Sequence, residues 1–227
     1  MSSKTVDIIR ELKGLKAGNL KSFQIPVKNQ SGITIGWLKP INEILSKDIF
    51  IVDSLTKWRR KFIRHFLTQF EPTNERTISW LESVVLPDDT RILFLILDTQ
   101  GKLIGNFGIC DINQNSAELD NLIRGEKGGD SQLIFFSEIS LMHWIYKNIK
   151  VADIYLRVFS NNFRTKALHE LVGFEECQSQ YLIKTCNNNG EVEYQSSDIG
   201  NNESEQLKLI KMRMKRNIFM EKYSNIN

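Results

Sequence analysis

The stretch from residue 91 to residue 159 constrains the fold of this chain most, because its hydrophobic period changes there twice. It begins with RILFLILD and LIGNFGICDI, which are joined by the turn TQGK, and this pattern predicts a β-hairpin over 91–112. AELDNLIRG at 117–125 alternates and predicts a third strand, whereas SQLIFFSEISLMHWIYKNI at 131–149 has the helical period. DIYLRVF at 153–159 predicts a buried strand. A strand–helix–strand crossover that follows antiparallel strands indicates a mixed α/β fold.

The segments on either side predict further parts of the same domain. Before the hairpin we expect a short helix with Val6, Ile9, Leu12 and Leu15 on its apolar face, a strand at ITIGWLKPI, two helical pieces within 42–70 and a helix at NERTISWLESVV. After the crossover we expect a helix within NNFRTKALHELVGF and strands at ECQSQYLIKTC and LKLIKMRMKR. The predicted fold is therefore α/β, with a mixed, mostly antiparallel central sheet and flanking helices. We expect a helical extension and connector over 1–30, one domain over 31–216 with a polar loop or flexible hairpin at 187–206, and a tail over 217–227.

Composition excludes several classes of protein. The 227 residues carry a net charge of +3, from 30 basic and 27 acidic residues, which is too small to indicate nucleic-acid binding. The N-terminus lacks the apolar run of a signal peptide, and no segment has the ~20 apolar residues of a membrane span. The three cysteines, Cys110, Cys177 and Cys186, have no C-x-x-C spacing, so we expect reduced thiols and no metal. These features predict a soluble, cytoplasmic protein without nucleic-acid or membrane partners, and they are compatible with a homo-oligomer.

The junction LIRGEKGGD at 122–130 lies between a predicted strand and the long predicted helix. Free backbone N–H groups at a helix start attract phosphate, and glycines let a ligand approach the backbone. Arg124 and Lys127 have the charge to neutralise a pyrophosphate. The same residues also fit an ordinary turn in which Asp130 or Ser131 caps the helix.

The stretch NNFRTKALHELVGF, residues 161–174, has the same two interpretations. Asn162 follows a strand and precedes a helix, so it is either a helix cap or a side chain that binds a ligand at the strand ends. His169 is either a structural helix residue or a proton donor, because its reference pKa is near ~6.5.

Together these motifs resemble the GNAT acyltransferases, especially their RimL-like and sugar-modifying branches. Asn162-x-x-Thr165-x-x-x-His169-x-x-x-Gly173-Phe174 is similar to the family pattern N-x-x-[A/S]-x-x-x-Y-x-x-x-G-F. WLKPI, SLTKWRR and ISWLESV resemble the N-terminal half of the family, so the resemblance covers residues 33–216. ELDNLIRGE looks most like GNAT proteins of bacterial surface-polysaccharide genes. Two positions depart from the pattern: the loop RGEKGG differs from [Q/R]-x-x-G-x-[G/A], and His169 stands where tyrosine is common.

The resemblance implies an N-acetyltransferase that moves the acetyl group of acetyl-CoA to a primary amine of a small acceptor. The acceptor that it suggests is a nucleotide-linked amino sugar in surface-polysaccharide biosynthesis. Two alternatives remain: a protein N-terminal acetyltransferase, and a non-catalytic GNAT module that binds CoA or a partner.

The resemblance also implies site residues. Acetyl-CoA would contact Asn121, Leu122, Ile123, Arg124, Lys127, Gly128, Gly129, Asp130, Asn162 and Thr165. The acceptor would contact Trp58, Arg59 and Asp111, where an aromatic ring and a guanidinium suit a nucleotide-linked sugar; a basic, solvated helix face is the alternative for the first two.

The catalytic candidates are Asp120 and Glu118 as the base and His169 as the donor to the thiolate. Strand alternation predicts Glu118, Asp120, Leu122 and Arg124 on one face, and Leu119, Asn121 and Ile123 on the other. Two neighbouring carboxylates raise each other's pKa, which favours a proton-handling role. A solvated acidic pair, or an ion pair between Asp120 and Arg124, is the alternative.

Overall fold

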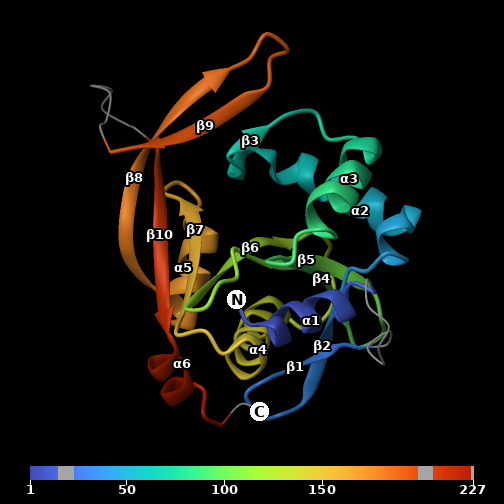
Figure 1. Ribbon diagram of the computed structural model, residues 1–227, viewed down its shortest axis with the longest axis vertical. Coiled ribbons are helices and arrows are strands. Elements are labelled where there is room, and N and C mark those ends of the chain that lie inside the picture. The colour runs from blue at the N-terminus through green and yellow to red at the C-terminus, as the bar shows by residue number, and fades with distance from the viewer. Residues whose placement is uncertain (15–22, 199–206, 226–227) are drawn as a thin grey trace.

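A single ten-stranded sheet organises the computed structural model, which describes residues 1–14, 23–198 and 207–225 (Figure 1). The strand order is β1-β2-β4-β5-β6-β7-β10-β8-β9-β3. The strands are β1 (Ile25–Lys28), β2 (Thr34–Pro40), β3 (Thr68–Gln69), β4 (Ile92–Asp98), β5 (Leu103–Cys110), β6 (Ser116–Arg124), β7 (Asp153–Phe159), β8 (Glu175–Cys186), β9 (Val192–Ser197) and β10 (Lys208–Lys215).

Only the pair β6–β7 is parallel among these strands, and all other described pairs are antiparallel. The parallel pair is joined by a crossover through the longest described helix, α4. The helices are α1 (Ser3–Leu12), α2 (Ile49–Phe62), α3 (Asn74–Trp80), α4 (Leu133–Asn148), α5 (Phe163–Val172) and α6 (Arg216–Lys222), with short helical turns η2 (Leu45–Lys47), η3 (Ile63–His65) and η4 (Leu81–Val85). This arrangement confirms the predicted mixed, mostly antiparallel α/β fold.

The sheet has an apolar core on each face. Along β4, Phe94 and Ile96 belong to the larger core, which α1 and α4 cover, whereas Leu93 and Leu95 belong to the core under α2 and α3. This division follows from the period of two, because successive side chains of a strand point to opposite faces. The run ILFLILD reads as continuously apolar because both of its faces are covered. Each described helix is too short or too polar to cross a membrane.

The structure differs from the predicted elements at both ends. Residues 25–28, expected as a connector, form strand β1 and pair with β2 at the sheet edge. Residues 216–222 form helix α6 rather than a tail, because Phe219 is fully buried and the Tyr223 hydroxyl donates to the Val172 carbonyl at 2.8 Å. Leu15, expected on the apolar face of the first helix, lies outside the described residues.

The region after β8 is a hairpin in its described part. Strand β9 pairs with β8, and the two-residue strand β3 pairs with β9. Of the two interpretations of 187–206, the hairpin is therefore the one that the described residues show, and residues 199–206 lie outside them. In Figure 1 the hairpin rises beyond the rest of the sheet, toward the side where α2 and α3 lie.

Candidate functional site

The parallel strands β6 and β7 pair over only part of their length. Residues Ser116–Leu119 pair with Asp153–Leu156, yet β6 continues to Arg124 and β7 to Phe159. The carboxyl ends of the two strands therefore separate. In open α/β sheets such a separation between neighbouring parallel strands is where ligands bind.

A β-bulge lies on β6 where this separation begins. Gly108 of β5 pairs with Asp120, but Asn106 pairs with Ile123, so β6 has one extra residue between these pairs. Asn121 takes the extra length with a φ of 51°, and its carbonyl accepts a hydrogen bond from the Asn106 amide at 2.5 Å.

The bulge corrects the predicted faces of β6. Glu118 and Asp120 share one face, as expected, but Ile123 joins the α2 core on that face and Leu122 packs against the opposite core. Regular alternation would have placed Leu122, not Ile123, beside the two carboxylates. The extra residue at Asn121 inverts the pattern beyond it.

The loop between β6 and α4 presents a series of free donors. Within the described residues, the backbone N–H groups of 127–131 make no hydrogen bond, whereas the carbonyls of Gly125, Lys127 and Gly128 accept hydrogen bonds from cationic side chains. The Lys102 ammonium donates to the Lys127 carbonyl at 2.8 Å, the Arg124 guanidinium to the Gly128 carbonyl at 2.8 Å, and the Lys61 ammonium to the Gly125 carbonyl at 3.3 Å. Five successive free N–H groups beside cations form a suitable site for a pyrophosphate.

The conformation of this loop depends on its glycines. Gly128 and Gly129 have φ of 119° and 66°, values that residues other than glycine adopt only at a cost in free energy. Asp130 turns the chain into the helix, because its carboxylate accepts from the Gln132 N–H at 2.7 Å. Asp130 therefore closes the turn, while Gly128 and Gly129 expose the N–H groups.

Trp58 of α2 lies beneath this loop. Its side chain is fully buried, and its indole Nε1 donates to Glu126 Oε1 at 3.1 Å. The ring is in such close contact with Gly125 that a Cβ there would lie 1.9 Å from Cε2 of the indole. Trp58, expected to contact the acceptor, presents no surface to one and instead holds the loop.

Arg59 also lies away from an acceptor surface. Its Nη2 donates to the Thr68 carbonyl at 2.8 Å, and its guanidinium stacks 3.5 Å from the centre of the Phe66 ring. Burial lowers the pKa of Arg59 to about 10. Arg59 therefore ties α2 to β3, although the sequence analysis expected it to contact the acceptor.

Asp120 forms an ion pair on the α2 face of the sheet. Its Oδ2 accepts from Arg91 Nη1 at 2.5 Å and from the Asn121 amide at 2.8 Å, whereas its Oδ1 has no partner among the described residues. Burial raises the pKa of Asp120, and the Arg91 guanidinium opposes that rise. Two expectations are thereby corrected: the partner is Arg91 rather than Arg124, and burial rather than Glu118 is the main cause of the shift.

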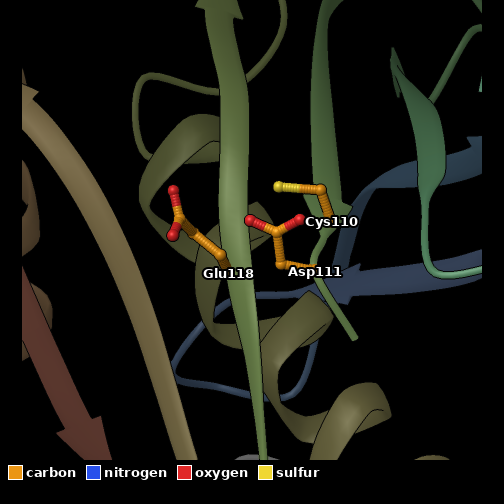
Figure 2. Close-up of side chains that lie close together, drawn as sticks. All are labelled: Cys110, Asp111 and Glu118. Atoms are coloured by element: carbon orange, nitrogen blue, oxygen red, sulfur yellow. The ribbon is translucent and has the colours of Figure 1, made fainter. Parts of the chain in front are cut away.

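Glu118 and Asp111 share an arginine of β7. Arg157 Nε donates to Glu118 Oε1 at 2.7 Å, and Arg157 Nη2 lies 3.5 Å from Asp111 Oδ2. Asp111, Glu118 and Cys110 have possible ligand atoms within 4.8 Å of one another, and Figure 2 shows their side chains gathered at the junction of β5 and β6. Burial raises the pKa of the Cys110 thiol, and a metal needs the thiolate. Arg157 offsets one of the two carboxylate charges, so Asp111 and Glu118 suit the acidic end of a substrate pocket better than a metal site with Cys110.

A polar pocket of about 480 Å³ lies on this face of the sheet. Glu118 and Asp111 form one end, and strands β7, β8 and β10 form the floor with Tyr155, Arg157, Gln178, Gln180, Leu209 and Lys211. Sequence reasoning missed all six of the floor residues. Alternation in DIYLRVF and LKLIKMRMKR indicates which of their residues share a face, but not that the two strands are neighbours.

Helix α5 brings Asn162 and Thr165 near the end of β7. Asn162 follows the end of β7 by three residues, and its side chain makes no capping hydrogen bond to α5. It therefore leaves an amide available beside the opening between β6 and β7. Thr165 is half-buried one turn further along the helix.

The side chain of His169 makes a buried contact between helices α5 and α4. Its Nδ1 lies 2.7 Å from Glu138 Oε1 of α4, and both side chains are buried, with 5% and 0% exposed. Its ring also packs edge-on against Phe174 at 5.9 Å. His169 thus joins α4 to α5 through a buried hydrogen bond, which fits the structural interpretation of this residue.

Comparison with known proteins identifies the fold. Residues 48–193 match the family model described as "Acetyltransferase (GNAT) domain". Comparison with curated proteins gives no match.

Three solved structures illustrate the likeness. A spermidine N-acetyltransferase from Vibrio cholerae in complex with CoA and spermine has a TM-score of 0.60 at 18% identity, over 81% of this chain and 96% of that one. RimL, a ribosomal L7/L12 alpha-N-protein acetyltransferase in complex with CoA, has a TM-score of 0.63 at 12% identity, over 86% and 99%. Apo FdhC, a nucleotide-linked sugar GNAT, has a TM-score of 0.60 at 11% identity, over 89% and 96%. At these identities the likeness shows the fold, not the acceptor.

Proposed function

Because the chain belongs to the GNAT acetyltransferase family, we propose that it transfers the acetyl group of acetyl-CoA to a primary amine. The observation that carries the proposal is the opening between β6 and β7, which is flanked by the loop with free N–H groups at 127–131. A thioester in the opening and a pyrophosphate on the loop would be bound by one continuous surface.

The residues around the opening fit acetyl-CoA as the cosubstrate. The N–H groups of 127–131, with Lys102 and Lys127 beside them, would hold the pyrophosphate, and Asn162 would hydrogen-bond the extended arm. Acetyl-CoA supplies an acetyl group activated as a thioester. The bulge at Asn121 places the backbone of 121–123 at the start of the opening, where an N–H would meet the thioester oxygen.

Asp120 is our candidate for the base that takes the proton from the acceptor amine. Burial raises its pKa, and its Oδ1, a buried atom without a hydrogen-bond partner among the described residues, could accept a proton. Glu118 lies on the same face and, with Asp111, places two carboxylates beside the single guanidinium of Arg157, and the remaining negative charge favours a role in binding the ammonium form of the acceptor. The bound ammonium loses one proton to Asp120 before it attacks, and its nitrogen then gains the acetyl group and loses a second proton. The departing thiolate gains one proton, and the other is released to solvent. Because His169 is hydrogen-bonded to Glu138, we assign the protonation of the thiolate to water.

The acceptor that we propose is a small amine, with a nucleotide-linked amino sugar as the leading candidate. The pocket supports this candidate because it combines the carboxylates Glu118 and Asp111 with the cations Arg157 and Lys211. The likeness to FdhC, a nucleotide-linked sugar GNAT, is compatible with it. The likeness to RimL makes a protein N-terminus the second candidate.

A non-catalytic module is the alternative outside the enzymes. The burial of His169 favours it, since the position where the family often has tyrosine offers no proton donor here. Such a module would bind CoA or a partner without turnover.

Calorimetric titration with acetyl-CoA tests the proposal, with desulfo-CoA and ATP as comparison ligands. We expect saturable micromolar binding of the CoA species and weaker binding of ATP. Asn162→Ala should weaken acetyl-CoA binding, whereas Asn161→Ala, at the exposed neighbouring position, should not. Acetyl transfer to a panel of amines, followed by mass, then separates an enzyme from a module. Absence of CoA binding would refute the cosubstrate assignment, and binding without transfer to any amine would favour the module.

A further inference from the structure

The floor of the pocket contains a lysine, Lys211, that pairs with no acidic side chain in the described part of the chain. We propose that Lys211, with Gln178 beside it, binds an anionic group of the amine acceptor, a phosphate or diphosphate. This inference rests on the proposed function, because it concerns the acceptor of the same reaction.

The sheet register places the three side chains in one row. Lys211 of β10 pairs with Arg157 of β7 on one side and with Gln178 of β8 on the other. Directly paired residues point to the same face of a sheet. The neighbours of Lys211 along its strand, Ile210 and Met212, belong to the core on the opposite face. Lys211 therefore points into the pocket together with the amide of Gln178.

Arg157 and Lys211, the two cations of this row, differ in their partners. Arg157 is committed to Glu118 and Asp111, at 2.7 and 3.5 Å. The Lys211 ammonium lies 4.3 Å from the centre of the Tyr155 ring, and within the described residues it forms no ion pair. An aromatic ring orients a cation but does not neutralise it. The Lys211 ammonium is thus left for a ligand to bind.

The two ends of the pocket have opposite preferences. Glu118 and Asp111 suit an ammonium, whereas Lys211 suits an anion. Strand β10 of Lys211 lies two strands from β6 of Glu118, which corresponds to about 10 Å at the usual spacing between strands. A sugar ring with an attached diphosphate spans a length of this order between its amine and its phosphates. A polyamine would instead place a second cation against Lys211 and Arg157, which like-charge repulsion disfavours.

The test compares three amines that differ in charge. UDP-glucosamine has an amine and a diphosphate, glucosamine has the amine alone, and spermidine is a polycation. Each is titrated into the full chain by calorimetry with CoA at saturation, so that the diphosphate does not occupy the loop at 127–131. Lys211→Met is the test variant. Lys208→Met is its matched control, because Lys208 lies on the same strand and over a tyrosine ring, at 4.7 Å, but points to the other face.

We expect UDP-glucosamine to bind at least about tenfold more tightly than glucosamine, as one charge-assisted hydrogen bond would provide. Lys211→Met should remove about tenfold of this affinity, and Lys208→Met should leave it unchanged. Equal affinity for the two amino sugars, tighter binding of spermidine, or an unchanged Lys211→Met variant would overturn the inference.

The same titrations separate this inference from the proposed function. CoA binding without a preference for the diphosphate would leave the proposed function standing and refute the anion site. Absence of CoA binding would refute the cosubstrate assignment, and the effect of Lys211→Met on UDP-glucosamine, measured without CoA, would then decide the anion site alone.

Discussion

The contact between Gly125 and Trp58 predicts that a single methyl group will disturb the loop between β6 and α4. In Gly125→Ala the new Cβ would lie 1.9 Å from Cε2 and 2.2 Å from Nε1 of the indole. Gly125 is not among the residues with positive φ, so the strain comes from this contact alone. The atoms must separate by about 1.6 Å to reach the roughly 3.5 Å of a normal carbon contact.

The size of the effect follows from which partner can move. Trp58 is fully buried and hydrogen-bonded to Glu126, so the loop, rather than the ring, must move. Overpacking of this kind costs about 1–3 kcal/mol. For a chain of this length each kcal/mol lowers Tm by roughly 2–4 °C, so we expect a fall of about 2–12 °C. Because the loop carries the free N–H groups of 127–131, the Kd for acetyl-CoA should rise about tenfold or more.

Thermal melting and calorimetric titration of Gly125→Ala measure both effects. Trp58→Phe serves as the control, because the smaller ring makes room for the Cβ. In the double variant part of the lost stability should return, and the double-mutant cycle should show a coupling of about 0.5–3 kcal/mol. An unchanged Tm and Kd in Gly125→Ala, or strictly additive effects in the cycle, would refute the reasoning.

Three further predictions concern ionisable groups. Asp120→Asn should lower kcat about 10²–10⁴-fold and abolish the loss of rate at low pH, because the base works only when deprotonated and burial raises its pKa above 3.8. Glu118→Gln should keep the loss of rate at low pH. A pH–rate profile of Asp120→Asn like that of the unchanged protein would exclude Asp120 as the base. His169→Leu removes the hydrogen-bond partner of the buried Glu138, so we expect a loss of about 1–3 kcal/mol, a Tm lower by roughly 2–12 °C, and an unchanged pH–rate profile; an altered profile would return His169 to the reaction. Burial lowers the pKa of Lys13 to about 8 from 10.5, so between these pH values the unfolded chain binds more protons and stability rises with pH. In Lys13→Met the rise of Tm between pH 8 and 10 that comes from Lys13 should be absent. An equal change of Tm with pH in the variant and the unchanged protein would contradict this prediction.

Local patterns in the sequence were sufficient for most of the elements. The hairpin at 91–112, the strand before the loop and helix α4 follow from hydrophobic period and turn residues, which are properties of neighbouring positions. The loop at 124–130 and the start of α5 at Asn162 were visible for the same reason. Strand β1 was missed because four residues provide too short a pattern.

The sequence by itself thus determined the kinds of element, their order and the place of the glycine-bearing loop at 124–130. Only the tertiary structure decided which charges meet: Arg91 with Asp120, Arg157 with Glu118, and His169 with Glu138. Each of these pairs joins residues at least 29 positions apart, so no local period encodes it. The bulge at Asn121 shows the same limit, because one extra residue in a strand pairing inverts every side chain beyond it. Pairing register and helix packing are set by the whole core, and they create the pocket.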